Sequence, residues 1–271
     1  YPETESVSVF GGEELSPPQY GKVFITIKPF YGPYVPDSIK NNLNATLRKY
    51  SVAGIVTEIQ DLKYLFIEVD VNAYYNPNLA ANSSSVKTVI LDNINKYADS
   101  SEMNKYGARF KYSRFQTIID NSNDSITSNI TKIEMRRDMK PALNQNAEYE
   151  LCFGNSFYIK NNDGYNIRSS GFTIFGMADT VYLSDIPTND RVGNLFLFKL
   201  DGRNSPTVVT SNVGTIDYER AEILLKPINI VGTSKKVQDI PIIEISACPK
   251  SNDIVGLQDL YLQLDINNST V

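Results

Sequence analysis

Residues 22–29 read Lys-Val-Phe-Ile-Thr-Ile-Lys-Pro, and this stretch sets the pattern for the first half of the chain. Apolar side chains at every second position, Val23, Ile25 and Ile27, are typical of a β-strand with one buried face, because successive side chains of a strand point to opposite sides. Pro29 cannot donate a backbone hydrogen bond, and it closes the strand. The sequence therefore predicts that a sheet begins here.

Helices and further strands follow this stretch in a regular order. A helix is expected from about Ser38, because one apolar stripe recurs there at helical spacing, and a second is expected to open at Ser83. The stripe residues are Ile39, Leu43, Leu47 and Tyr50 in the first helix and Val89, Ile90, Ile94 and Tyr97 in the second. Further strands are expected at residues 54–60, 64–75 and 126–135, with a short helix at 115–121.

The order strand, helix, strand, strand, helix, strand is that of the ferredoxin-like, or split βαβ, arrangement. We therefore expect residues 21–140 to form an α+β domain with a four-stranded antiparallel sheet and helices on one face. Residues 1–20 contain Gly and Pro pairs among acidic side chains, which predicts an extended arm or linker. Within this arm, residues 7–10 alternate and could pair with a sheet edge.

Beyond Pro141 the helical pattern disappears. Short runs rich in Val, Ile, Phe, Leu and Tyr alternate with turn formers such as Asp201-Gly202 and Asn212-Val213-Gly214. This pattern predicts a β-rich domain over residues 141–271, as a small sandwich or open barrel. Residues 257–266 are expected to form a last strand whose partner lies further along a longer polypeptide.

Composition excludes several classes of function. The 271 residues include no His, which removes Ser-His-Asp and Cys-His catalysis and His-ligated zinc. The formal net charge of −5 provides no general attraction to nucleic acid or anionic lipid, and no apolar run is long enough to span a membrane. Cys152 and Cys248 are far apart in the sequence and form no metal-binding pattern, so we expect two buried free thiols, with a disulfide as the alternative.

The residues that could carry chemistry have simpler structural explanations. Glu68 and Asp70 share one face of a strand, as a glycosidase or a metal site would require, but also as the polar face of a half-buried strand does. Residues 161–164, Asn-Asn-Asp-Gly, resemble the opening of a calcium loop that lacks its closing Glu, and a hairpin turn explains them. We therefore predict no catalytic, metal or cofactor site.

Basic and aromatic residues offer two further hypotheses. Arg109, Lys111 and Arg114 interleave with aromatic residues, as in a single-strand nucleic-acid platform, but the acidic balance favours ordinary surface cations. The 17 Tyr suit protein interfaces, because exposed Tyr buries much area at low entropic cost. As candidate interface residues we select Val7, Val9, Phe10, Tyr31 and Tyr34.

Two stretches resemble a known protein family. Residues 9–13 (Val-Phe-Gly-Gly-Glu) and 17–25 resemble a segment that joins the inner and outer parts of the baseplate wedge proteins of T-even-like contractile-tailed phages, the baseplate J-like family. Residues 213–218, running into Ile223-Leu224-Leu225, are similar to a turn-and-strand motif of the same family, in which Gly often stands at the position of Ala221. The resemblance covers most of the chain and implies that it is the C-terminal portion of a wedge protein.

The resemblance implies a structural role. Such proteins form homodimers that alternate in a ring around the tail axis, join neighbouring wedges, contact other wedge proteins and rearrange when the baseplate opens at the host surface. They are late virion proteins, assembled in the host cytoplasm. No catalytic residue, cofactor, nucleic acid, membrane or small-molecule substrate is implied.

Two alternatives stay open at this point. The β-rich domain and its Tyr residues could form a carbohydrate- or receptor-binding module of a phage tail or a cell surface. A carboxylate-dependent glycosidase built on Glu68 and Asp70 is the third hypothesis.

Overall fold

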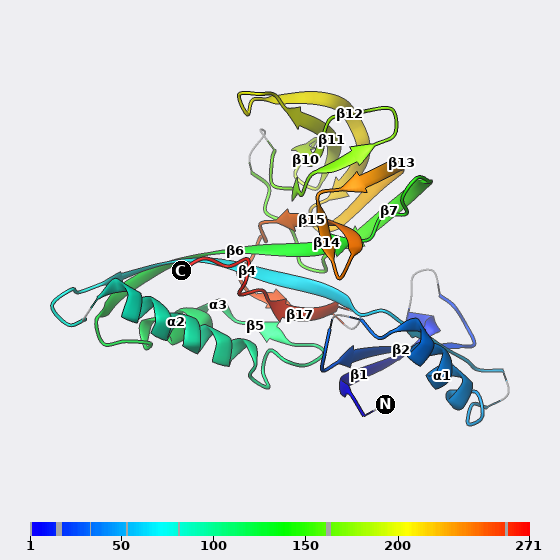
Figure 1. Cartoon of the computed structure of the whole chain (residues 1–271), viewed down its shortest axis with the longest axis horizontal. Coiled ribbons are helices and arrows are strands. Elements are labelled where there is room, and N and C mark those ends of the chain that lie inside the picture. The colour runs from blue at the N-terminus through cyan, green and yellow to red at the C-terminus, as the bar shows by residue number, and fades with distance from the viewer. Residues whose placement is uncertain are drawn as a thin grey trace.

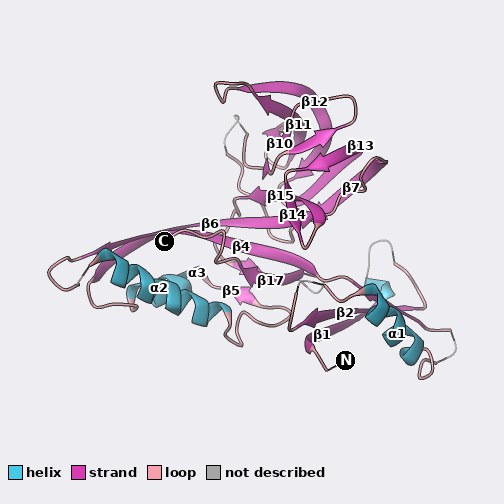
Figure 2. Cartoon of the chain, viewed as in Figure 1, coloured by secondary structure: helices cyan, strands magenta, loops and turns pink. Residues whose placement is uncertain are grey.

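The computed structural model describes residues 2–14, 18–32, 34–52, 54–80, 82–160, 164–257 and 260–271. Three parts are visible in Figure 1: a small N-terminal sheet with one helix, a long central sheet with two helices beneath it, and an upper lobe made of strands. Strands dominate the molecule, as Figure 2 shows. The α+β, strand-rich class expected from the sequence is therefore correct.

The N-terminal unit is a three-stranded sheet with a helix on one face. Its strands are ordered β1-β2-β3; β1 and β2 are antiparallel, β2 and β3 are parallel, and α1 connects that parallel pair. The elements are β1 (Thr4–Gly11), the short 3-10 helix η1 (Gly12–Glu14), β2 (Lys22–Pro29), α1 (Asp37–Leu47) and β3 (Val56–Gln60). Much of the segment expected to be an extended arm is thus the strand β1, with Val9 paired to Ile25.

The central sheet is ordered β14-β15-β6-β4-β17, with β8 pairing to β15. The antiparallel β4 and β6 form its long axis, and α2 and α3 lie below them in Figure 1. The elements are β4 (Lys63–Tyr75), α2 (Ser83–Ala98), α3 (Tyr112–Asp120), β6 (Ile126–Met139), β8 (Arg168–Ser169), β14 (Lys235–Val237), β15 (Ile240–Ala247) and β17 (Leu260–Leu264). A separate small pair joins β5 (Arg109–Phe110) to β16 (Ile254–Val255).

Three of the four residues expected on the buried face of α2 are buried, and the face begins one turn earlier than expected. Val86, Ile90, Ile94 and Tyr97 are buried, whereas Val89 is not. The spacing of four, four and three residues keeps these side chains on the stripe that faces the sheet. The Asn82 side chain accepts a hydrogen bond of 2.7 Å from the Ser85 amide and so caps the first turn.

The expected ferredoxin-like sheet is not formed, although its six elements occur in the expected order. The strands β2 and β3 lie in one sheet, and β4 and β6 lie in another. The physical reason is that both edges of β4 are occupied, one by β6 and the other by β17, which runs parallel to it from Leu260 opposite Lys63. The last strand therefore finds its partner much earlier in the chain and not further along it.

The upper lobe confirms the expected succession of short strands. Its sheet is ordered β10-β11-β12-β13-β7, with β9 paired to β13. The strands are β7 (Asn146–Cys152), β9 (Phe172–Ile174), β10 (Tyr182–Pro187), β11 (Val192–Leu200), β12 (Pro206–Asp217) and β13 (Glu222–Thr233). The expected turn at residues 212–214 is wrong, because these residues lie inside β12.

One buried apolar cluster runs through the central sheet and the upper lobe, from Leu65 to Leu264. A second, small cluster under α1 contains Ile27, Val35 and Ile59. The boundaries at residues 20 and 140 stay predictions about independently folding units.

Candidate interaction surfaces

The outer edge of the N-terminal sheet carries two exposed apolar side chains. Val7 and Val9 pair with Ile27 and Ile25, and residues directly opposite each other share one face of a sheet. On β2 this face is covered by α1, but the helix does not reach across β1, so Val7 is 49% and Val9 59% exposed. An edge strand with exposed valines is suited to pair with another chain.

The other three predicted interface residues lie in different surroundings. Tyr31 is 83% exposed, whereas Phe10 is buried and its ring stacks on Phe24 at 5.6 Å. Tyr34 is half-buried against Tyr64, with ring centroids 6.4 Å apart. Burial, with a smaller contribution from nearby Asp138, raises the pKa of Tyr34 to about 12. Val7, Val9 and Tyr31 are thus available for contact, while Phe10 and Tyr34 stabilise the fold.

Sequence reasoning missed a larger exposed group on the same unit, which we call the distal patch. It gathers where β2 and β3 begin, because Lys22 pairs with Val56 and the Val56 amide donates to the Gly21 carbonyl at 2.8 Å. Its members are Tyr20, Tyr50, Val52, Ile55 and Val56, which are 42–83% exposed. The expected place of Tyr50 on the buried stripe of the first helix is wrong, because α1 ends at Leu47 and leaves Tyr50 exposed.

A third exposed group, of two residues, lies on the ribbon formed by β4 and β6. Tyr74 and Ile130 are 54% and 53% exposed, and the pairings Tyr74–Ser128 and Asn72–Ile130 place them diagonally on one face. Tyr75 points to the other face and packs against the main core. Of these two neighbouring tyrosines, Tyr74 is therefore the one accessible to a partner.

Of the two carboxylates considered for catalysis, Glu68 belongs to a cluster around one buried arginine. Arg136 on β6, with a side chain only 6% exposed, forms ion pairs with four carboxylates contributed by four segments. Besides Glu68, these are Asp138 at 3.0 Å, Asp265 at 2.9 Å and Glu244 at 3.9 Å. The guanidinium also lies 4.4 Å from the ring centroid of Phe66.

Glu68 and Asp70 are both held by structural contacts, Glu68 within this cluster and Asp70 outside it. Burial raises the pKa of Glu68, and the positive charge of Arg136 offsets only part of that effect. Asp70 instead accepts a hydrogen bond from the Thr270 hydroxyl, so the two carboxylates are held by different partners. Within the described residues, no group of three or more acidic or thiol side chains has the geometry of a metal site.

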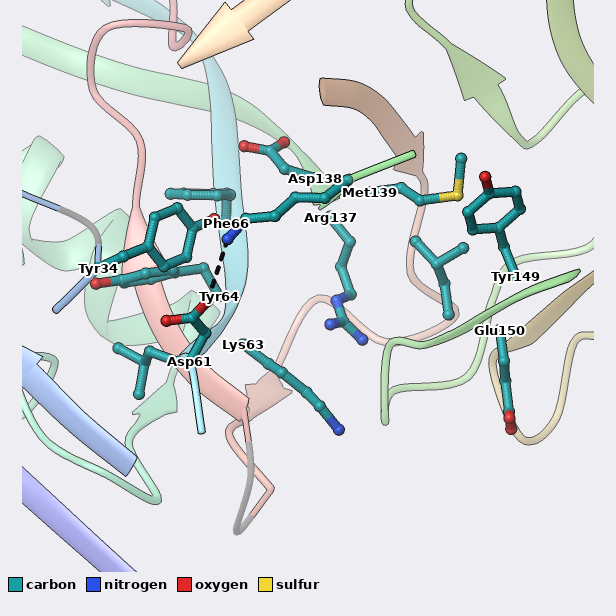
Figure 3. A pocket seen from close by; sticks show the side chains of 13 residues that line it. Tyr34, Asp61, Lys63, Tyr64, Phe66, Arg137, Asp138, Met139, Tyr149 and Glu150 are labelled. Carbon is teal, nitrogen blue, oxygen red and sulfur yellow. Dashed lines mark hydrogen bonds and ion pairs between the residues drawn. The ribbon is translucent and has the colours of Figure 1, made fainter. Parts of the chain in front are cut away.

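A cavity of about 360 Å³ lies where the N-terminal unit meets the central sheet and β7. Figure 3 shows Tyr34, Tyr64 and Phe66 on one side of it, and Tyr149 and Glu150 on the other. Its lining carries charges of both signs. Asp61, for example, forms ion pairs with Lys40 at 2.7 Å and Lys140 at 3.3 Å, and these contacts connect the N-terminal unit to β6.

The remaining sequence hypotheses can be placed briefly. Cys152 and Cys248 are free and partly buried, and burial raises the pKa of both thiols. Phe110 is fully buried and Tyr112 donates to the Thr131 carbonyl, so these aromatic rings do not form a base-stacking platform. Residues 161–163 of the considered calcium loop lie outside the described residues. None of the described helices is long and apolar enough to cross a bilayer.

Comparison with known proteins gives matches to two domains of one family. Residues 1–60 match the description "Baseplate structural protein gp6, C-terminal domain I", and residues 63–138 match "Baseplate structural protein gp6, C-terminal domain III". The two matched regions cover just over half of the 271 residues. They correspond to the N-terminal unit and to the segment from β4 to β6.

A curated relative agrees with these matches. The chain is 26% identical over 121 residues to the baseplate wedge protein gp6 of Enterobacteria phage T4. The aligned stretch is 44% of this chain and 18% of the relative, so the chain spans only a small part of that protein's length.

Proposed function

This chain belongs to the family of the baseplate structural protein gp6, as its C-terminal portion, and from that premise we propose that it joins neighbouring wedges of a phage tail baseplate by self-association. The observation that carries the proposal is the exposed apolar surface of the N-terminal unit. Two separate groups, the β1 edge and the distal patch, occupy a unit of about 60 residues. Exposed apolar groups of this kind mark protein–protein contacts.

Two groups are also what a ring of dimers requires. A homodimer with two-fold symmetry uses one patch that meets its own copy, whereas joining dimers into a ring needs a second, different contact. We assign the β1 edge, through Val7 and Val9, to the two-fold contact, because two antiparallel edge strands can continue one sheet. The distal patch then serves the contact between dimers or with other wedge proteins.

The proposal also covers the location of the chain in the phage particle and the change in its contacts during infection. The chain would lie in the virion, in the baseplate of a contractile tail, after assembly as a late protein in the host cytoplasm. Its contacts would rearrange when the baseplate opens at the host. The family is structural and not enzymatic, which agrees with the structural roles of Glu68 and Asp70.

Light scattering on a sizing column, over a range of protein concentrations, tests this proposal. We expect wild type to dimerise, and Val9→Lys to weaken dimerisation at least about tenfold, because a charge would be buried without a partner at the interface. Val208→Lys is the matched control, since Val208 is 56% exposed on β12 of the upper lobe. A strict monomer at every concentration, or an equal loss with the control, would contradict the proposal.

A glycan array separates this function from the carbohydrate-binding alternative. A ring subunit should bind no glycan on the array. Specific binding that survives Val9→Lys and is lost on substitution in the upper lobe would favour the alternative.

A further inference from the structure

Three side chains from distant parts of the chain meet beside the N-terminal unit. The ammonium of Lys28 on β2 donates a hydrogen bond of 2.6 Å to Oδ1 of Asn104, which lies in the loop after α2. The same Nζ is 2.7 Å from Oε2 of Glu5 on β1. The Asn104 amide nitrogen in turn donates to the other oxygen, Oε1, of Glu5. One carboxylate therefore bridges an amine and a carboxamide that already touch each other.

We propose that Lys28 and Asn104 join in an intramolecular isopeptide bond, with Glu5 as the group that moves the protons. The reaction needs a lysine amine next to the carbonyl carbon of an Asn side chain, and an acid that reaches both the amine and the departing nitrogen. These are the three contacts that Lys28, Asn104 and Glu5 make.

The attacking and attacked atoms are close enough to react. A carbonyl bond is about 1.2 Å long, so Cγ of Asn104 lies no further than about 3.8 Å from Nζ, given the 2.6 Å to Oδ1. Reacting atoms in near-attack arrangements are typically about 3–3.5 Å apart. A small side-chain movement is therefore sufficient.

A hydrogen-bond donor is already placed where negative charge would develop. The Tyr261 hydroxyl donates to Oδ1 of Asn104, the oxygen that becomes an oxyanion when the amine adds to Cγ. Burial raises the pKa of Tyr261, which keeps the hydroxyl protonated and able to donate. The Tyr261 ring packs edge-on against Tyr106 at 5.3 Å and holds the Lys28 ammonium 4.7 Å from its centroid.

The backbone at Glu5 is irregular in a way that serves this arrangement. The pairing of β1 with β2 shifts between Thr4 and Ser6, so two residues of β1 oppose one of β2 at Glu5. Such a bulge turns a side chain away from strict alternation. Glu5 therefore reaches Lys28, although the direct partner of Lys28 in the ladder is Ser6.

The steps balance without any further reactant. Lys28 passes a proton to Glu5 and, as the free amine, forms a bond from Nζ to Cγ of Asn104, while the carbonyl electrons move to Oδ1. Glu5 then delivers its proton to Nδ2, the bond between Cγ and Nδ2 breaks, and the carbonyl re-forms. The second proton of the attacking amine passes through Glu5 to the leaving ammonia. The products are one secondary amide and one ammonium ion.

The first proton transfer makes the reaction slow. Burial tends to raise the pKa of Glu5, but its hydrogen bonds with Lys28 and Asn104 lower it by more, so the resting state is the ion pair. The reactive pair, neutral amine and neutral acid, carries the same number of protons as the ion pair. The rate should therefore be constant near neutral pH and fall in acid, where Glu5 takes up a proton from solvent.

The burial of the reacting side chains, and the position of the bond in the fold, both agree with a structural cross-link. The side chains of Lys28 and Glu5 are only 16% and 21% exposed, and the four groups line a cavity of about 550 Å³ through which ammonia can leave. The bond would tie the N-terminal unit to the loop after α2 and enclose α1, β3, β4 and α2 in a covalent ring. A subunit that bears load during a rearrangement would then keep these two parts together.

Intact-mass spectrometry of the purified, denatured full chain is the test. We expect a mass lower than that of the sequence by one ammonia, and a tryptic product in which residues 23–40 and 97–105 are joined. Glu5→Gln and Lys28→Arg should restore the full mass, and Tyr261→Phe should slow the loss of ammonia. Lys40→Arg, at another ion-paired lysine of the same unit, is the matched control and should leave the cross-link intact.

The wild-type mass decides the question without any variant. The full, unmodified mass after prolonged incubation of the folded protein at neutral pH would overturn the proposal. So would a loss of ammonia in which the two tryptic peptides remain separate, because Asn can also lose ammonia by reacting with its own backbone.

Discussion

The hydroxyl of Tyr218 donates a hydrogen bond of 2.6 Å to Oδ2 of Asp185, and both side chains are at most 1% exposed. The other oxygen of Asp185 accepts from the Ile167 amide at 2.7 Å. Burial raises the pKa of Asp185, and these hydrogen bonds offset only part of that effect. The pair connects β10 to the end of β12 within the core of the upper lobe.

Tyr218→Phe should lower the free energy of unfolding by about 1–3 kcal/mol, because it leaves a buried carboxylate oxygen without its partner. Urea denaturation at neutral pH measures this loss. Tyr31→Phe removes a hydroxyl from a residue that is 83% exposed and should change stability by less than about 0.5 kcal/mol. Equal effects of the two substitutions would contradict the assigned role of Tyr218.

Acid should loosen the N-terminal unit before the upper lobe. Burial tends to raise the pKa of Asp61, but its bond to Lys40 and the charge of Lys140 lower it by more. A carboxyl with a lowered pKa stabilises the fold above its unfolded value, near 3.9, and that contribution is lost as the pH falls through its folded value. The pKa of Asp185 is raised instead. The stability that depends on this carboxyl is therefore present at low pH and decreases as the pH rises.

Amide hydrogen exchange at pH 7 and at about pH 3.5 checks this order. Protection in β2 should fall at low pH, while protection in β11 should persist. Asp61→Asn should reduce the pH dependence and cost only about 0.5–1 kcal/mol at neutral pH, because the Asp61 side chain is 39% exposed and solvent screens its ion pairs. Simultaneous loss of protection in both strands would argue against a separate acid-sensitive junction.

Arg136→Met should be among the most damaging single substitutions in the central sheet. Four carboxylates would lose their shared cation, and removing one partner of a buried ion pair costs about 3–5 kcal/mol. Arg168→Met removes an arginine whose side chain is 64% exposed and should cost less than about 1 kcal/mol. Thermal unfolding of the two variants side by side gives the comparison, and similar melting temperatures would refute the assigned importance of the cluster.

Gly214→Ala should destabilise the upper lobe by about 1–3 kcal/mol or more, the usual cost of overpacking. An added Cβ would lie 2.1 Å from the carbonyl oxygen of Leu224 on the neighbouring strand, and backbone atoms there cannot move aside cheaply. Gly202→Ala is the control, because nothing lies within 4 Å of its added Cβ. A tolerated Gly214→Ala would show that β12 and β13 are less closely apposed than the structure has them.

Local sequence signals predicted most of the elements. The helix α2 begins at Ser83, where the second helix is expected to open, and β4 begins one residue before its expected position. These predictions succeed because the spacing of apolar residues that is typical of a strand or a helix is visible within a few residues of sequence. The turn expected at residues 212–214 failed, because Gly214 is needed for close approach to Leu224 and not for a positive φ.

Ala221 shows what a sequence motif can and cannot predict. The resemblance described above implies Gly at this position, and Ala221 has a φ of 57°, in the left-handed region that glycine favours. The residue is fully buried, so its methyl group gains contacts that offset part of the backbone strain. The motif pointed to this position, but only the structure shows that Ala221 adopts the left-handed conformation there.

The sequence alone determined where most strands and helices form, and that His-based chemistry is excluded. Each of these follows from residue type and local spacing. The tertiary structure decided how the strands pair, because β17 reaches β4 from nearly 200 residues away and blocks the edge that a ferredoxin-like sheet would need. It also brought Lys28, Glu5 and Asn104 together, since contacts between distant segments depend on the packing of whole sheets and not on any local period.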